Sequence, residues 1–291
     1  MGIGLAVSRP TSNPPADRAA AVAVDPVIAA SDRLAEARRT GIPCAPVRDL
    51  IGPTDAMAAY EVQRRLQDEA VRGGRRISGR KISLASKAVQ TQLRVDQPGF
   101  GVLYSDMSCS QDETINLARL MQPRIEAEIA FVLTQDLRGN ITPRAVRAAV
   151  GLALPTLEIV DSRIADWDIA FSDTVADNAS SGLFVLGSPM DSVDIEPLST
   201  ASMTLRRNGA VVSRGAGAEC MGDPLTAVLW LARTAAFFGD PLCAGDIVLS
   251  GALGPMVPVE PGGRYHAEIG SCGIVEAHFG HRVGGPPREG K

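Results

Sequence analysis

Aromatic residues, basic charge and long apolar runs are all scarce in this sequence. Aromatic side chains make up 4% of the 291 residues, and the formal net charge is −4. A nucleic-acid-binding protein needs a basic field and usually stacking side chains, so that class is disfavoured. No uninterrupted apolar run is long enough to span a bilayer, so no membrane partner is expected. These shortages favour the chemistry of small molecules.

Paired cysteines are also lacking. The five cysteines are odd in number, widely scattered and without a C-x-x-C pair, so neither a disulfide framework nor a zinc site is indicated. The apolar run at the start of the chain is too short for a signal peptide and follows no basic residue. We therefore expect reduced thiols, no export and a cytoplasmic location.

The hydrophobic pattern divides the chain into four segments. Residues 1–26 include a Pro-, Ala- and Ser-rich stretch without a usable period, which indicates a flexible leader, and residues 284–291 form an expected mobile tail. Residues 27–75 carry apolar side chains at helical spacing and predict a helical N-terminal region. In residues 76–283, short β-branched runs alternate with helical patterns, which predicts a mixed α+β body.

Three local elements can be predicted with a physical reason. The first helix should end at Gly41, because a glycine tolerates the left-handed conformation that follows many helices. Residues 203–213 read as two strands joined by Asn208 and the glycine after it, a pair that tolerates positive φ at both turn positions. A third element is a helix that begins at Pro224 with Asp223 as its N-cap.

A pair of carboxylates lies within the apolar segment 123–133 (PRIEAEIAFVL). Side chains alternate along a strand, so Glu126 and Glu128 share one face, with backbones roughly 7 Å apart. Their neighbours on that face, Ala130 and Val132, are apolar. Two like charges in such surroundings are costly unless a cation neutralises them, which suggests a metal site.

A third carboxylate, Glu158, lies in a second apolar run at 154–163 (LPTLEIVDSR). Carboxylates without Cys or His suit a hard cation such as Mg²⁺ or Mn²⁺, with positions left open for water and a chelating substrate. The alternative is that Glu126 and Glu128 form ion pairs with Arg124 and other basic residues on a half-exposed strand. The pattern alone favours neither reading.

Several long motifs in order carry a resemblance to a known family. They are GRKISLASKAVQTQLRVDQPGFGVLYSDM, QPRIEAEIAFVL, LEIVDSRIADWDI, DTVADNASSGLFVLG, ECMGDPLTAVLWLA and GDIVLSGALGPMVPV. From about residue 41 to 279 the chain resembles the 2-keto-4-pentenoate hydratases of the fumarylacetoacetate hydrolase superfamily. The resemblance implies an α+β fold, a mixed β-roll with flanking helices after the helical N-terminal region, and a homo-oligomer.

The resemblance also implies the metal ligands and an acid/base residue. In such enzymes the matching glutamates, here Glu126, Glu128 and Glu158, hold the divalent ion, Mg²⁺ or Mn²⁺. The lysine of the G-x-K motif matches Lys81, which would exchange protons in the pocket with a pKa perturbed by burial. A plain salt bridge is the alternative for Lys81.

Polar residues of two loops are implied in substrate binding. Asn178 and Ser180 of the DNASS turn, and Ser250 of the LSGALGPM loop, have short side chains that would bind a substrate carboxylate. Ordinary turn chemistry is a serious alternative, because Asn and Ser suit turns in any protein.

One position departs from the family pattern. Many of these hydratases read PDFG, with the Asp beside the lysine in function, whereas this chain has Gly99 in that place. Asp96 or Asp106 would then substitute, or water would carry the proton, or the chemistry has moved towards the related 4-oxalocrotonate decarboxylases.

The implied activity is hydration of a small 2-hydroxy-dienoate, 2-hydroxypenta-2,4-dienoate or an analogue, to a 4-hydroxy-2-oxoacid in the meta-cleavage of aromatic compounds. The closest alternative is decarboxylation of a 2-oxo-enoate diacid on the same metal, and a further one is a non-catalytic partner subunit. A C–C hydrolase would need an early His, but the histidines are His266, His278 and His281. No complete dinucleotide- or phosphate-binding motif is present.

Overall fold

The computed structural model describes residues 24–93, 95, 97–188 and 198–281. The expected tail, residues 1–23 of the expected leader, and Asp96 fall outside these ranges. The helices are α1 (Pro26–Thr40), α2 (Arg48–Ile51), α3 (Ala56–Arg72), α4 (Lys87–Leu93), α5 (Pro143–Ala149), α6 (Phe171–Ala176) and α7 (Pro224–Phe237). The strands are β1 (Ile77–Ser83), β2 (Gly99–Tyr104), β3 (Ser108–Cys109), β4 (Thr114–Ile115), β5 (Arg124–Leu133), β6 (Val150–Val160), β7 (Ser181–Leu186), β8 (Ser202–Arg207), β9 (Ala210–Ala216), β10 (Ile247–Leu249), β11 (Val257–Pro258), β12 (Arg264–Ile269) and β13 (Gly273–Phe279).

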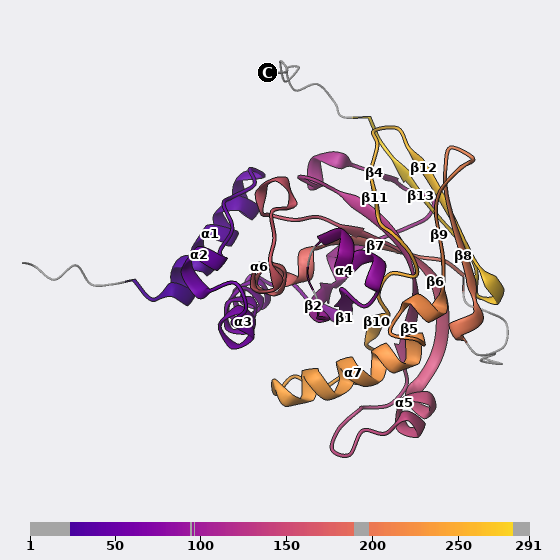
Figure 1. Cartoon of the computed structure of the whole chain (residues 1–291), viewed down its shortest axis with the longest axis horizontal. Helices are drawn as coiled ribbons and strands as arrows, with labels where there is room; N and C mark the ends of the chain where they lie inside the picture. Colours follow the sequence, from indigo (N-terminus) through magenta and orange to yellow (C-terminus); the bar gives the residue numbers. More distant parts are fainter. Residues whose placement is uncertain (1–23, 94, 96, 189–197, 282–291) are drawn as a thin grey trace, which may run out of the picture.

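Two sheets organise these strands (Figure 1). The larger has the order β2-β1-β10-β5-β6-β7-β3, with β11 also paired to β5, and the smaller has the order β4-β13-β12-β8-β9. Helices flank the curled larger sheet, with α1 to α3 on one side and α5 and α7 at one end. The fold is therefore mixed α+β with flanking helices, as the resemblance implies.

The larger sheet joins segments that are far apart in the sequence. β10 is inserted between β1, with which it runs parallel, and β5, with which it runs antiparallel. β5 and β6 form a long antiparallel ladder in which seven consecutive residues of β5, from 125 to 131, are buried. Both faces of β5 are thus covered, so its polar face points into the protein rather than into solvent.

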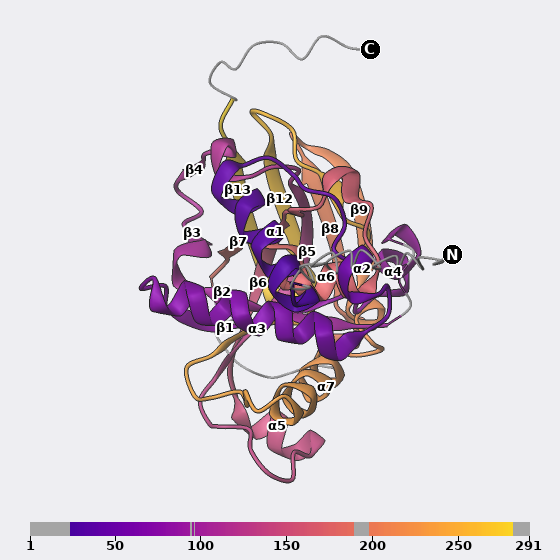
Figure 2. The same cartoon turned by 90° about the vertical axis from the view of Figure 1, so that its left-hand side faces the viewer.

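The helical N-terminal region packs directly onto this body (Figure 2). α1 ends at Gly41, which adopts a φ of 69°, and α3 follows. Buried side chains of the two helices, such as Leu34 and Val62, belong to the same hydrophobic cluster as Val175 of α6 and Ile129 of β5. The predicted helices are confirmed, and they share one core with the sheets.

The predicted hairpin and C-terminal helix are also confirmed. Asn208 and Gly209 join β8 to β9 with φ values of 49° and 85°. Asp223 caps α7 by accepting a hydrogen bond of 2.7 Å from the Leu225 N–H. None of the helices in the described ranges is both long and apolar enough to cross a membrane.

Candidate metal and substrate site

The three predicted glutamates meet in the interior of the larger sheet. Glu126 of β5 lies directly opposite Glu158 of β6 in the ladder, and Glu128 follows on the same face of β5. Their exposed fractions are 5%, 1% and 0% in that order. One carboxylate oxygen of each lies within 4.8 Å of the others, which is close enough for a single ion to contact all three.

These carboxylates have few partners of their own. Within the described ranges, Glu126 Oε2 and Glu128 Oε1 are buried without a hydrogen-bond partner, while Glu128 Oε2 accepts a bond of 2.8 Å from the Gly251 N–H. The alternative pairing with Arg124 is wrong, because that guanidinium lies over the Trp167 ring, 4.6 Å from its centroid. Carboxylate oxygens buried in this state would be stabilised by a bound cation.

Burial and mutual repulsion hold protons on the cluster when it contains no cation. Burial, with the charge of Glu158 second, raises the pKa of Glu126 to about 7. Burial and the charges of Glu158 and Glu126 raise the pKa of Glu128 well above its usual value. A group of acids that remain partly protonated at neutral pH is the behaviour expected where a metal ion normally supplies the positive charge.

Lys81 of β1 is the cation at this cluster. Its Nζ lies 3.0 Å from Glu158 Oε1, and both side chains are 1% exposed. Burial is the largest single influence and lowers the pKa of Lys81, but the combined charges of Glu158, Glu126 and Glu128 outweigh it and raise that pKa. The pKa of Lys81 is therefore raised, not lowered towards neutrality as burial alone would make it, and its contact with Glu158 is the salt bridge named above as the alternative.

A narrow pocket leads to Lys81 and Glu126. Two serine hydroxyls in its lining, Ser83 Oγ and Ser180 Oγ, are buried and have no hydrogen-bond partner within the described ranges. The remaining lining is mostly apolar: Leu84, Val89, Leu93, Val160, Trp167, Thr174, Ala179 and Met256. The pocket thus joins charged groups, hydroxyl groups and an apolar wall.

The side chains of the other two predicted substrate-binding residues bond to backbone groups. The side-chain amide of Asn178 bonds both backbone groups of Val102, accepting at 2.7 Å and donating at 2.9 Å, and so fastens the turn to β2. Ser250 Oγ accepts a bond of 3.3 Å from the Ile129 N–H and donates one of 3.2 Å to the Gly251 carbonyl. Neither side chain is among those that line the narrow pocket.

The turn that presents Ser180 is strained and firmly anchored. Asn178, Ala179 and Ser180 all have positive φ values, between 52° and 53°, which is costly for residues other than glycine. Asp177, just before them, forms a buried ion pair with Arg163, and the Arg163 N–H donates to the same carboxylate at 2.9 Å. This pair keeps the turn in a conformation that it would not adopt alone.

Two groups at the site were not predicted from the sequence. Ser83 is not predicted as a site residue, because a serine in an apolar strand does not by itself indicate a functional role. The Gly251 N–H lies at the cluster because residue 251 has a φ of 100°, and a Cβ there would come within 2.4 Å of the Ala85 Cβ. In the sequence, the glycine after Ser250 in the LSGALGPM motif indicated a special backbone position there, but not that its N–H bonds Glu128.

Of the two residues suggested to replace the missing family Asp, Asp106 lies within the described residues. Asp106 is exposed and its carboxylate lies 2.6 Å from Arg75, away from the residues that line the narrow pocket. That suggestion is wrong, and Asp96 lies outside the described residues.

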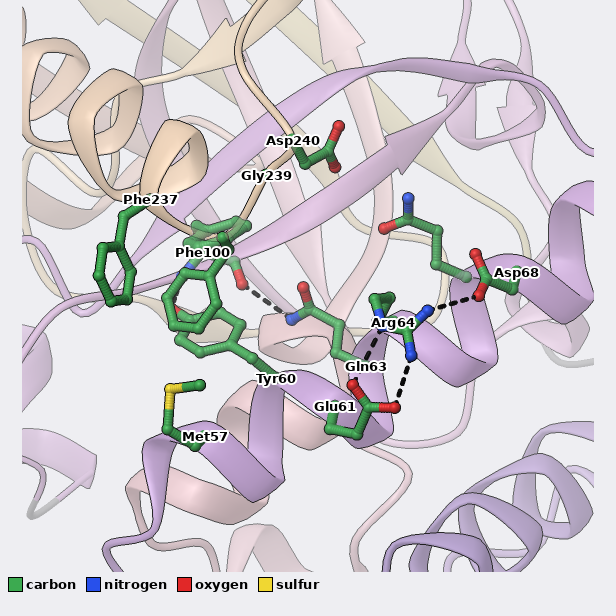
Figure 3. Close-up of a pocket in the computed structure, with 12 residues that line it drawn as sticks. Met57, Tyr60, Glu61, Gln63, Arg64, Asp68, Phe100, Phe237, Gly239 and Asp240 are labelled. Atoms are coloured by element: carbon green, nitrogen blue, oxygen red, sulfur yellow. Dashed lines mark hydrogen bonds and ion pairs between the residues drawn. The ribbon is translucent and has the colours of Figure 1, made fainter.

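A wider pocket lies at the surface between α3 and the end of α7 (Figure 3). Tyr60, Phe100 and Phe238 form an aromatic cluster in its wall. Arg64 is already paired there with Glu61 and Asp68, at 2.6 and 3.1 Å. The pocket shares no lining residue with the narrow one, and its charged groups are satisfied, so it offers no comparable reactive centre.

The donor set of the carboxylate cluster fits a hard divalent cation. Three ionised carboxylates and one ammonium carry a formal charge of −2, which one divalent ion balances. All three candidate ligands are oxygens, the preference of Mg²⁺ and Mn²⁺.

Comparison with known proteins agrees with this geometry. The model of the fumarylacetoacetate hydrolase C-terminal family matches residues 78–280. The chain belongs to the fumarylacetoacetate hydrolase family. The matched residues include every residue of the carboxylate cluster and of the narrow pocket.

Relatives that share about half of their matched residues with this chain are named hydratases. The chain is 52% identical over 252 residues to a TodF product hydratase of Pseudomonas putida, covering 86% of this chain and 94% of the relative. It is 50% identical over 251 residues to a 2-keto-4-pentenoate hydratase of Paraburkholderia xenovorans, with 86% and 93% covered. A solved structure of 4-oxalocrotonate decarboxylase from Pseudomonas putida, with magnesium and adipate, is similar with a TM-score of 0.81 and 32% identity, covering 87% and 97%.

Proposed function

We propose that this chain hydrates 2-hydroxypenta-2,4-dienoate, or a substituted analogue, to a 4-hydroxy-2-oxoacid in the meta-cleavage catabolism of aromatic compounds. The observation that carries the proposal is the cluster of three buried carboxylates beside Lys81 at the base of a narrow, mostly apolar pocket. Two relatives, 52% and 50% identical over 86% of this chain, are named TodF product hydratase and 2-keto-4-pentenoate hydratase.

Glu126, Glu128 and Glu158 would hold the divalent ion, Mg²⁺ or Mn²⁺. A bound divalent cation supplies a Lewis acid that stabilises negative charge on the carboxylate and 2-oxygen of a chelating acid. The Gly251 N–H fixes one oxygen of Glu128, so this ligand has a defined orientation before the ion arrives. Such preparation of the ligands reduces the reorganisation that binding would otherwise require.

Lys81 is the proton carrier in this proposal. Its ammonium lies 3.0 Å from Glu158, beside the position of the acid's polar end, and can deliver a proton to the substrate. After Lys81 has given up its proton, burial favours the neutral amine. The charges of the nearby carboxylates favour the return of the proton, so the two influences on the Lys81 pKa oppose each other. That opposition suits a group that must both give up and regain a proton.

Ser180 is the direct substrate ligand among the three predicted polar residues. Its buried hydroxyl lacks a partner and lines the pocket, so it can donate to the substrate carboxylate. Asn178 and Ser250 act by holding the turn and β10 in place, since their side chains are occupied with backbone groups. The apolar wall then contacts the hydrocarbon part of the dienoate.

The test is the loss of ultraviolet absorbance of 2-hydroxypenta-2,4-dienoate with Mg²⁺ or Mn²⁺, followed by identification of the product. We expect metal-dependent formation of 4-hydroxy-2-oxopentanoate, its loss in EDTA and in Glu126→Gln, and its retention in the matched control Glu61→Gln, which alters an exposed pair with Arg64. Release of CO₂ from 2-oxohex-3-enedioate without hydration would move the chain to the decarboxylase branch. Metal binding without either reaction would instead indicate a non-catalytic subunit.

We further infer a homo-oligomer that works in the cytoplasm. The support is the resemblance to oligomeric hydratases and the exposure of large apolar side chains such as Phe237, which is 77% exposed in the single chain. Light scattering coupled to size-exclusion chromatography tests the assembly, and a mass of about 30.5 kDa, that of one chain, would contradict it.

A further inference from the structure

The hydroxyl of Ser83 is a polar group of the pocket for which the mechanism above gives no role. Ser83 is the last residue of β1 and is 7% exposed, and its Oγ has no hydrogen-bond partner within the described ranges. A buried hydroxyl without a partner is unfavourable, and most such groups in folded proteins are satisfied by protein, water or a ligand. Because this one lines the substrate pocket, its missing partner is expected there.

Gly99 keeps a side chain away from the Ser83 hydroxyl. Ser83 and Gly99 face each other in the β1–β2 ladder. A Cβ at residue 99 would lie 3.2 Å from Ser83 Oγ and 3.2 Å from Val175 Cγ2, tighter than ordinary contacts. A side chain at 99 would therefore compete with the hydroxyl and with whatever it binds.

Ser83 lines the same narrow pocket as Lys81 and Glu126. Ser83 and Lys81 lie two residues apart on β1, so their side chains are on the same face of the strand. Lys81 has a long side chain that reaches back to Glu158, but the short side chain of Ser83 keeps its Oγ near β1. A substrate held between Glu126 and Lys81 would therefore lie in the same pocket as the Ser83 hydroxyl.

We propose that Ser83 Oγ binds and orients the water molecule that adds to carbon 4 of the substrate, beside Gly99. The inference rests on the proposed hydratase function. In this step the water oxygen bonds to carbon 4 of the enone, 2-oxopent-3-enoate, the carbon 3–carbon 4 double bond becomes single, and carbon 3 takes up a proton. The water loses one proton, so the balance is the addition of one H₂O.

The experiment separates the two halves of the reaction. Formation of the enone is followed by deuterium uptake at carbon 5 in D₂O, and hydration is followed by NMR of the 4-hydroxy-2-oxoacid. For Ser83→Ala we expect deuterium uptake within about twofold of the wild type and hydration reduced at least tenfold, with the enone accumulating. Ser83→Thr, which keeps a hydroxyl, should retain more hydration than Ser83→Ala.

Matched variants exclude a general packing effect. Ser172→Ala removes another buried, unpartnered hydroxyl, but one outside the pocket lining, and should leave both steps unchanged. Gly99→Ala should reduce hydration by crowding the hydroxyl, and should add little to the loss in a Ser83→Ala background, because the two changes act on the same water. Melting temperature and Mn²⁺ affinity are measured for each variant to confirm that fold and metal site are intact.

Three outcomes would overturn the inference. Normal hydration in Ser83→Ala would show that the hydroxyl does not orient the water. An equal loss of deuterium uptake and of hydration would show that Ser83 affects the whole pocket and not the added water in particular. A wild-type chain that performs neither step would overturn the proposed function and this inference with it, whereas the first two results leave the hydratase assignment standing.

Discussion

The oxygens of Glu126 that can hold a cation are also costly to bury in its absence. One of them lacks a hydrogen bond, and the pKa of the carboxyl is raised to about 7, chiefly by burial. We therefore expect Glu126→Gln to raise the melting temperature of the metal-free chain by removing a buried charge. The same change should weaken Mn²⁺ binding by at least roughly 100-fold. Even the mutation of a residue that only hydrogen-bonds to a metal ligand lowers metal affinity by roughly 10–100-fold.

Calorimetry of Mn²⁺ binding and thermal unfolding in EDTA measure the two effects. The control Glu61→Gln alters an exposed carboxylate and should change neither. A Glu126→Gln variant that is less stable without metal and binds Mn²⁺ normally would show that the carboxylate has a structural role only.

The same pKa predicts a pH dependence. The pKa of Glu126 is raised in the folded chain from 4.5 to about 7, so the folded state binds more protons than the unfolded state between these values. The stability that this group contributes is present below pH 4.5 and is lost as the pH rises towards 7. A metal ion binds the deprotonated form, so the gain in melting temperature on adding Mn²⁺ should grow over this window.

Melting curves from pH 4.5 to 8, with EDTA and with Mn²⁺, test this prediction. Comparison with Glu126→Gln isolates the contribution of this residue from that of other acids. A metal-dependent gain that is the same at pH 5 and pH 7.5 would contradict it.

The alternation of the β5 sequence was enough to pair Glu126 with Glu128, because strand geometry is local. Their meeting with Glu158 required the register of β5 on β6, which the sequence pattern does not encode, and was supplied by the family resemblance. Ser83 carried no signal at all, since its significance depends on Gly99, a neighbour on another strand.

At the scale of elements, the Ser180 turn depends on the buried pair between Arg163 and Asp177. Arg163 also donates to the Ser181 carbonyl at 2.8 Å, so one guanidinium fastens both ends of the turn. Arg163→Met would leave Asp177 buried without its counter-charge, and we expect a loss of about 3–5 kcal/mol in unfolding free energy. Because the turn presents Ser180, the KM of the surviving fold should rise as well.

Denaturant unfolding and steady-state kinetics measure these two consequences. Arg138→Met, which removes an exposed pair with Asp136, is the matched control and should cost less than about 1 kcal/mol. An Arg163→Met variant with normal stability would show that the strained turn holds its conformation without this pair.

Elements whose conformation depends on a few adjacent residues could be predicted from the sequence. Elements that depend on pairing between residues far apart in the chain could not. The hairpin at Asn208 and the helix capped by Asp223 depend on a few adjacent residues, and both are confirmed. The insertion of β10 between β1 and β5 joins residues more than a hundred positions apart, so no short pattern reveals it. The curl of the sheet follows from that pairing, so no short sequence pattern predicts it either.

For the whole molecule, the expected helical region at 27–75 packs against the expected catalytic body at 76–283. Gln63 of α3 donates from its side-chain amide to the carbonyls of Phe100 and Val175, at 2.9 and 2.7 Å. The hydrophobic cluster is continuous across the boundary. The helices therefore support β2 and α6, the two elements that flank Ser83 and the Ser180 turn.

This continuity predicts one cooperative unfolding transition for both segments. In calorimetry the metal-bound chain should unfold in a single step whose calorimetric and van't Hoff enthalpies agree for one cooperative unit. Gln63→Ala would leave two buried carbonyls unpaired, at a cost of roughly 1–3 kcal/mol each, and should lower this one transition as a whole. Two transitions, with only the earlier one shifted by Gln63→Ala, would mean that the helices fold separately and that the pocket does not depend on them for its shape.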